Sequence, residues 1–170
     1  YFLNGGRHDP YPGESRFLVP SPDVKTYNLC PKMSCEEVTE HIIQQMEYSC
    51  DCIIANYANA DMVGHTGDYD ATISAIEHID KCLQRIYEHA EKYQYELLIC
   101  ADHGNAEWMY KPENGTQITS HTSSPVPFLY CGNGNLKPRG TLQDILPTML
   151  NIMNIAIPEQ ITGSNLWKEK

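Results

Sequence analysis

Two short apolar runs, residues 51–57 and 97–101, lie on either side of a long amphipathic segment, residues 70–93. Apolar side chains recur along the long segment at three- and four-residue steps, which predicts a helix with one buried face. These side chains are Ile73, Ile76, Ile79, Leu83, Ile86 and Ala90. Each short run is typical of a strand that is buried on both faces. A strand, a helix and a second strand in this order predict an α/β fold with parallel neighbouring strands.

The N-terminal part of the chain has a different character. Residues 1–32 are rich in glycine, proline and polar side chains, as in Asn4-Gly5-Gly6, and are predicted to be extended coil. A helix is expected over residues 34–48. It should begin with a capping box, in which Ser34 is the N-cap and Glu37 occupies the third helical position.

Two further elements are expected near the C-terminus. Residues 126–130 form a third apolar run, and Pro127 within it indicates an edge strand or a bulge. Residues 141–153 are predicted to be a final helix, which Pro147 should cause to start late or to kink.

Composition excludes several classes of protein. The 170 residues include 12 Lys and Arg against 22 Asp and Glu, which gives a net charge of −10 and disfavours nucleic-acid binding. No apolar run approaches the roughly 18 residues of a membrane span, and the first residues do not form a signal peptide. The seven cysteines include no CxxC pair, which disfavours a zinc ribbon. Four of them, Cys52, Cys82, Cys100 and Cys131, lie in apolar segments, so we expect reduced thiols and a cytoplasmic protein.

Polar loops follow both buried runs, at residues 59–68 and 102–124. The carboxyl ends of parallel strands are where ligands bind in such sheets, so chemistry is expected in these loops. They carry five candidate metal ligands: Asp61, His65, Asp102, His103 and His121. Taken singly, each could be an ordinary polar loop residue or a structural histidine. Together, carboxylate and imidazole suit Mn²⁺ or Zn²⁺, and five ligands without a thiolate indicate most of a two-metal catalytic site.

These loops, with the chain around them, resemble cofactor-independent (2,3-bisphosphoglycerate-independent) phosphoglycerate mutase, within the alkaline-phosphatase-like superfamily. The resemblance runs in order through the whole chain. Its motifs are Tyr1-Phe2-Leu3-Asn4-Gly5-Gly6, Asn59-Ala60-Asp61-Met62-Val63-Gly64-His65-Thr66-Gly67, Ala101-Asp102-His103-Gly104-Asn105-Ala106-Glu107, His121-Thr122, Pro125-Val126-Pro127-Phe128, Asp144-Ile145-Leu146-Pro147-Thr148 and Thr162-Gly163.

The resemblance implies a fold and a place within it. The fold would be a three-layer α/β/α sandwich of the alkaline-phosphatase type that is incomplete here. Residues 1–170 would form the C-terminal portion of the metal-binding phosphatase domain, with extended coil at 1–32 and the α/β core at 33–170. The N-terminal part of the sheet and the inserted transferase domain would be absent.

The resemblance also implies a reaction. Such enzymes interconvert 3-phosphoglycerate and 2-phosphoglycerate in glycolysis and gluconeogenesis through a phosphoserine intermediate, without 2,3-bisphosphoglycerate. They use two Mn²⁺ ions, with Zn²⁺ or another divalent metal as the alternative. By motif match, Asp61, His65 and His121 would hold the first metal, and Asp102 and His103 the second. The nucleophilic serine and the catalytic lysine would lie upstream, so this chain alone is expected to be inactive.

Two alternatives stay open at this point. One is another metalloenzyme of the same superfamily, such as a phosphopentomutase or a phosphatase. The other is a metal-binding module without catalysis of its own. The complete enzyme is expected to be a monomer. The shorter chain would expose an open sheet edge and apolar surface, through which it could self-associate.

Overall fold

The protein is described by a computed structural model that covers residue 3 and residues 5–168. Residues 1–2, 4 and 169–170 lie outside this part, and with them most of the predicted Tyr1-Phe2-Leu3-Asn4 opening. The predicted coil is otherwise confirmed, because residues 5–32 contain only turns, bends and a single 3₁₀ turn at Tyr27–Leu29.

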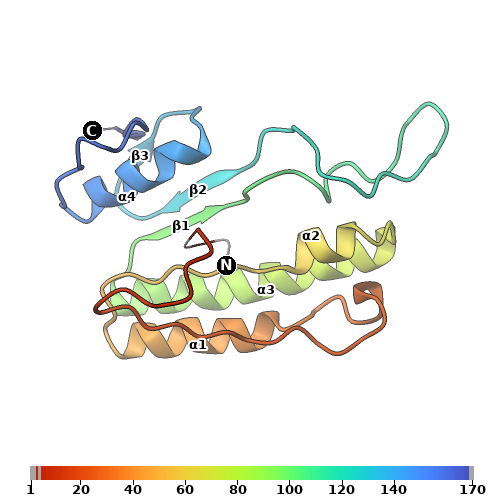
Figure 1. The fold of residues 1–170 in the computed structure, drawn as a ribbon, viewed down its shortest axis with the longest axis horizontal. Helices are drawn as coiled ribbons and strands as arrows, with labels where there is room; N and C mark the ends of the chain where they lie inside the picture. The colour runs from red at the N-terminus through yellow and green to blue at the C-terminus, as the bar shows by residue number, and fades with distance from the viewer. Residues whose placement is uncertain (1–2, 4, 169–170) are drawn as a thin grey trace.

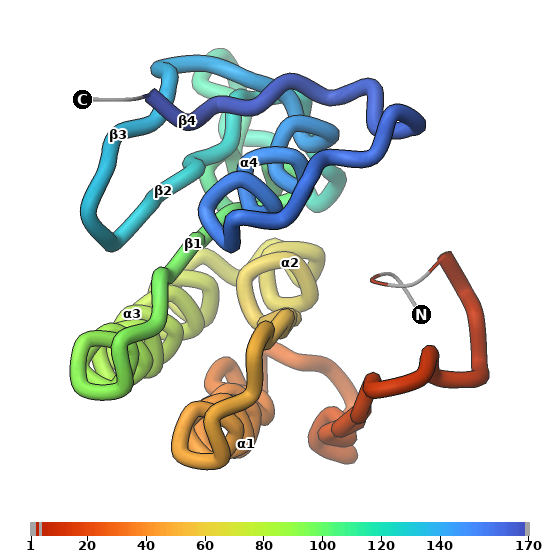
Figure 2. Tube along the Cα trace, turned by 90° about the vertical axis from the view of Figure 1, so that its left-hand side faces the viewer, coloured from red at the N-terminus to blue at the C-terminus, as the bar shows by residue number. Residues whose placement is uncertain are grey.

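Helices lie below a narrow sheet in Figure 1, and one further helix lies above it. The lower layer comprises α1 (Cys35–Glu47), α2 (Asn59–Gly64) and α3 (Tyr69–Tyr93). We call residues 35–93 the helical half and residues 97–168 the strand half. Figure 2 shows the two halves end-on, with β1 next to α3 and with α4 among the strands.

The helical half is built around two apolar clusters. Ile42 and Met46 of α1 pack with Ile86 and Ala90 of α3, and all four are buried. Nearer the start of α3, a second cluster forms around Val63, which is fully buried. The period of three to four residues therefore predicted both long helices within one residue of their observed bounds.

The start of each long helix shows a different cap. Asp68 caps α3 by accepting a hydrogen bond from the Ala71 amide at 3.0 Å. The capping box predicted for α1 is wrong, because Ser34 instead donates its hydroxyl to the Pro20 carbonyl at 2.7 Å. The N-terminal coil passes the end of α1 and supplies an acceptor that competes with the helix amides.

The face that α3 buries also differs from the prediction. Ile73 and Ile76 are 42% and 44% exposed, while Ala71, Thr72 and Ala75 are buried. The reason is α2, which packs on the small residues at the beginning of α3. The predicted apolar face holds only for the second half of the helix, at Ile86 and Ala90.

The strand predicted over residues 51–57 is wrong. This segment is an extended connector without a ladder, and Ile54 is 63% exposed. A strand requires a hydrogen-bonded neighbour, and no strand in the described part of the chain pairs with this segment. Tyr57 nevertheless anchors its end, since its hydroxyl lies 2.6 Å from that of Thr39 in α1.

The strand half contains two small sheets. β1 (Leu97–Cys100) pairs with β2 (Phe128–Cys131), which confirms two of the predicted strands. The pair is antiparallel and not parallel as predicted, because the loop between the strands reverses the chain and no helix intervenes. A second antiparallel pair, β3 (Asn135–Leu136) with β4 (Trp167–Lys168), was not predicted.

The last helix starts late, as Pro147 indicated. A 3₁₀ turn at Leu142–Asp144 leads into α4 (Ile145–Ile152), so Pro147 lies in the first turn, where its missing N–H leaves no hydrogen bond unmade. Among the described residues, no helix is both long enough and apolar enough to cross a membrane.

Candidate metal centre

The centre begins on α2, where a polar loop had been predicted. Asn59 is buried and donates its side-chain amide to the Pro31 and Lys32 carbonyls, at 2.8 and 2.7 Å. These bonds and buried Val63 hold the short helix against its neighbours. Asp61 and His65 are four residues apart, so both side chains lie on the same face. Asp61 Oδ1 lies 3.1 Å from His65 Nε2.

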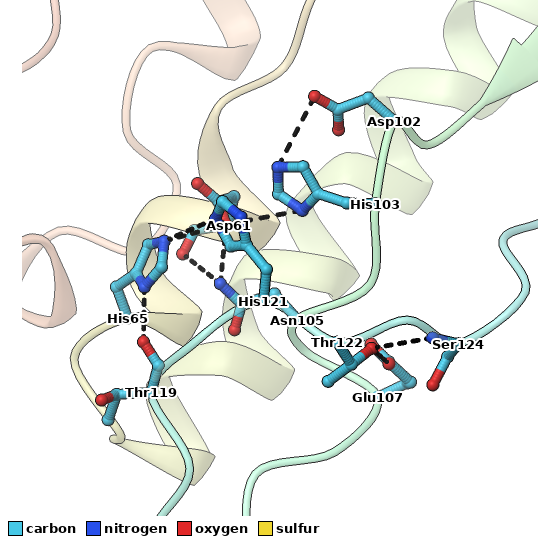
Figure 3. Close-up of polar contacts among 10 residues, drawn as sticks. All are labelled: Asp61, His65, Asp102, His103, Asn105, Glu107, Thr119, His121, Thr122 and Ser124. Carbon is cyan, nitrogen blue, oxygen red and sulfur yellow. Dashed lines mark hydrogen bonds and ion pairs between the residues drawn. The ribbon is translucent and has the colours of Figure 1, made fainter. Parts of the chain in front are cut away.

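His121 reaches this pair from the strand half. Its Nε2 lies 3.1 Å from Asp61 Oδ1 and 3.0 Å from His65 Nε2. Figure 3 shows the three side chains converging. Atoms that bind one metal ion at about 2.0–2.2 Å are separated from each other by about 3.0–3.5 Å, so this donor set fits a divalent cation. The side chains are 34–49% exposed, which leaves the centre open to solvent and substrate.

The hydrogen bonding of His65 favours a ligand role. Its Nδ1 lies 2.6 Å from the Thr119 carbonyl, which can only accept, so Nδ1 carries the proton. The lone pair is then on Nε2, the atom that faces Asp61 and His121. Orientation of an imidazole through its second nitrogen is the usual arrangement at metal sites.

His103 and Asp102 lie beside this trio. His103 Nε2 is 3.6 Å from Asp102 Oδ2, and its Nδ1 is 4.0 Å from Asp61 Oδ1. The His103 ring stacks on that of His121, with centroids 3.6 Å apart. His103 Nδ1 is buried and has no hydrogen-bond partner. A buried nitrogen of this kind suits a metal ligand, and one ligand atom from each of Asp61, His103 and His121 lies within 4.8 Å of the others.

All five predicted residues are thus near one another, but not in two separate groups. Asp61 faces three histidines, and His103 lies between Asp61 and Asp102. Asp102 is the outermost, with a side chain 76% exposed. The division of the ligands between two metals stays a prediction.

Asn105 contacts the candidate centre and was missed by sequence reasoning. It is buried, and its Nδ2 donates to Asp61 Oδ1 at 2.6 Å and to the Asp61 carbonyl at 3.3 Å. A Cβ at Gly64 would lie 2.7 Å from Asn105 Oδ1, so the glycine allows this close approach. Only its place two residues after His103 could have indicated it, because its partner lies 44 residues earlier in the sequence.

Glu107 and Thr122 were also missed. The Thr122 hydroxyl donates to Glu107 Oε1, which links the loop after β1 to the segment that carries His121. Desolvation of its carboxylate raises the pKa of Glu107, but hydrogen bonds from Thr122, Ser124 and nearby backbone amides outweigh it and leave this pKa below its ordinary value. The carboxylate is therefore ionised at neutral pH.

A pocket of 540 Å³ opens next to the centre. It is lined by His65 and Thr66 together with Lys25, Tyr27 and Asn28 of the N-terminal coil. The N-terminal coil thus contributes Lys25 to the lining of a pocket that a candidate ligand also lines.

Comparisons of the sequence and of the structure with known proteins both find similarity to phosphoglycerate mutases. The chain is 46% identical to the 2,3-bisphosphoglycerate-independent phosphoglycerate mutase of Francisella philomiragia and 48% identical to that of Pseudomonas syringae pv. tomato, over 99% and 100% of its length. A crystal structure of Leishmania mexicana phosphoglycerate mutase, determined at low cobalt concentration, matches all of this chain with a TM-score of 0.84 and 31% identity.

The chain covers only part of these proteins, namely 34% of each of the two curated relatives and 35% of the Leishmania chain. Its fold is accordingly an incomplete alkaline-phosphatase-like fold, as predicted. The model of the metalloenzyme superfamily matches residues 1–157. The chain described here therefore belongs to the metalloenzyme superfamily.

Proposed function

We propose that residues 1–170 form the C-terminal portion of the metal-binding phosphatase domain of a 2,3-bisphosphoglycerate-independent phosphoglycerate mutase. The observation that carries this proposal is the convergence of Asp61 Oδ1, His65 Nε2 and His121 Nε2 within 3.1 Å of one another. In this enzyme 3-phosphoglycerate and 2-phosphoglycerate are interconverted, as the similarity to mutases supports.

The proposed ligands of the first metal are Asp61, His65 and His121, and those of the second are Asp102 and His103. Oxygen and imidazole ligands without thiolate support Mn²⁺, with Zn²⁺ as the alternative. When bound, such ions neutralise phosphoryl oxygens and lower the pKa of an attacking hydroxyl.

The chain's own residues prepare the centre for this role. Asn105 donates to Asp61 and holds its carboxylate toward the histidines. The Thr119 carbonyl keeps the Nε2 of His65 unprotonated. Lys25, in the adjacent pocket, offers a positive charge to an anionic substrate. The nucleophilic serine and the catalytic lysine belong, in this proposal, to other parts of the enzyme.

Two features of the whole enzyme belong to the same proposal. It works as a cytoplasmic protein, which the seven free cysteines support. It functions as a monomer, since one chain supplies all five proposed ligands.

The proposal is tested in the complete enzyme that contains these residues, by coupling 2-phosphoglycerate formation to enolase. We expect turnover of 3-phosphoglycerate to depend on added Mn²⁺ and to be lost in His65→Ala. The matched control is His78→Ala, a substitution on α3 outside the centre, which should retain turnover. Equal rates in wild type and His65→Ala would contradict the proposal.

The same assay separates a mutase from a phosphatase. A phosphatase would release inorganic phosphate from 3-phosphoglycerate, whereas a mutase conserves the phosphoryl group. Phosphate release that accounts for all substrate consumed, without 2-phosphoglycerate, would contradict the mutase and leave the metal centre in place.

A further inference from the structure

Thr122 connects two segments that carry proposed metal ligands. Its amide donates to the Gly104 carbonyl at 2.8 Å, which forms an isolated antiparallel bridge between these residues. Its hydroxyl donates to Glu107 Oε1 and accepts a hydrogen bond from the Ser124 amide at 3.3 Å. Both the backbone and the side chain of Thr122 therefore attach its segment to the loop after β1, as Figure 3 shows for the side-chain contacts.

The side chains of Thr122 and Glu107 approach the backbone of residue 104 so closely that this position requires glycine. A Cβ on Gly104 would overlap Thr122 Oγ1 and Glu107 Oε1, so no other residue fits without moving this contact. Gly104 and Thr122 directly follow His103 and His121 in the sequence. The bridge therefore lies immediately beside the two stacked imidazoles, whose planes are inclined by only 20°.

The carboxylate of Glu107 is suited to hold this contact. It is ionised at neutral pH, and a hydroxyl that donates to a charged oxygen forms a stronger hydrogen bond than one that donates to a neutral oxygen. Within the described part of the chain, Glu107 forms no hydrogen bond or ion pair with Asp61 or with the three histidines of the centre. Its carboxylate reaches the segment that carries His121 through the side chains of Thr122 and Ser124.

We propose that Glu107 is a positioning residue that holds His121 in the metal centre through the hydroxyl of Thr122. The inference rests on the proposed function, because it assigns Glu107 a role only if His121 binds metal. Without this hydrogen bond the segment 120–124 loses the side-chain link next to His121, and the His121 ring is held less firmly against His103 and Asp61.

Co²⁺ binding tests this role, because the visible absorption of bound Co²⁺ reports the geometry of its ligands. In Thr122→Val, which removes the hydroxyl and keeps the shape, we expect a rise in the Co²⁺ dissociation constant of about 10- to 100-fold and an altered spectrum. Thr122→Ser retains the hydroxyl and should restore both. Glu107→Ala should reproduce the effect of Thr122→Val, and the double variant should lose no more than either single one.

The outcomes distinguish the two proposals. If the wild type binds Co²⁺ and both Thr122→Val and Glu107→Ala bind it with the same affinity and spectrum, the positioning role alone is overturned. A Thr122→Ser variant no better than Thr122→Val, or additive losses in the double variant, would overturn it as well. Absence of Co²⁺ binding by the wild type would overturn the metal centre and this role with it. Melting curves show whether each variant is folded. If Thr122→Val does not fold, Glu107→Ala provides the test, because position 107 is exposed.

Discussion

The two halves of the molecule are held together by different forces. The helical half encloses apolar clusters, in which Ile42, Met46, Ile86 and Ala90 are at most 8% exposed. The strand half has a two-stranded sheet of four residues per strand, and the polar loop within it is fixed by hydrogen bonds. The helical half therefore provides a stable base, whereas the strand half provides groups that must be fixed by polar contacts.

The proposed metal centre lies where these halves meet. Asp61 and His65 come from the helical half, and His103 and His121 come from the strand half. Several hydrogen bonds join the halves near this point, among them those from Asn105 to Asp61 and from His65 to the Thr119 carbonyl. Stability and metal binding should therefore respond to different substitutions.

The largest effect is expected from Asp61, the residue that faces every histidine of the centre. Asp61→Asn keeps the shape of the side chain and removes its charge, so Mn²⁺ affinity measured by calorimetry should fall by more than about 100-fold. Asp70→Asn, on the exposed start of α3, is the matched control and should bind as the wild type does. Equal affinities for the two variants would place the metal elsewhere.

A core substitution should separate stability from binding. Ile86 is 3% exposed, and Ile86→Ala should reduce the free energy of unfolding by about 2–5 kcal/mol in a urea titration. Ile73→Ala, at 42% exposure on the same helix, should reduce it by much less. We expect Ile86→Ala to bind Mn²⁺ normally under conditions in which it is folded. A large loss of affinity there would show that the halves are not separable.

Substitution of Asn105 should affect Mn²⁺ binding more than stability, which is the reverse of the effect expected for Ile86→Ala. In Asn105→Ala, the Asp61 carboxylate loses a buried donor, and Mn²⁺ affinity should fall by about 10- to 100-fold. Asn114→Ala, at the exposed tip of the same loop, is the control. Calorimetry that finds the same affinity for both variants would show that Asn105 does not orient Asp61.

The smallest effect concerns pH and the C-terminal end of the strand half. Hydrogen bonds from the Ser164 and Thr141 amides, both at 2.7 Å, lower the pKa of Asp144 from its ordinary value of 3.8. A lowered pKa in the folded state means that the ionised carboxylate stabilises the protein above pH 3.8, and that this contribution is lost as pH falls through the lowered value.

Asp144→Asn should therefore have a lower Tm than the wild type at about pH 6, and the difference should shrink toward about pH 2. Glu159→Gln, an exposed carboxylate of the same half, is the control. A difference between Asp144→Asn and wild type that stays constant over this range would contradict the assigned role of the charge.

Sequence predicted the two halves unequally. α1 and α3 were predicted because their apolar period is local and their packing partners lie within the same half. The strand over residues 51–57 and the parallel pairing were wrong, because strand formation depends on a neighbour that no local pattern specifies. α2 was missed because its six residues are too few to show a period.

In the candidate site too, local features could be predicted from the sequence and long-range contacts could not. Its five proposed ligands could be named because they lie in two motifs and one further histidine, all within polar loops. Asn105 and the Thr119 carbonyl could not, because their partners are 44 and 54 residues away in the sequence. Residue types indicated which groups could bind a metal, and only the fold shows which groups orient them.

The most direct test of a metal centre between the two halves is a crystal of this protein grown with Mn²⁺ and measured for anomalous scattering by manganese. The account predicts an anomalous peak within bonding distance of Asp61 Oδ1, His65 Nε2 and His121 Nε2. A peak coordinated by other residues, or none at this position in crystals that hold Mn²⁺, would contradict it.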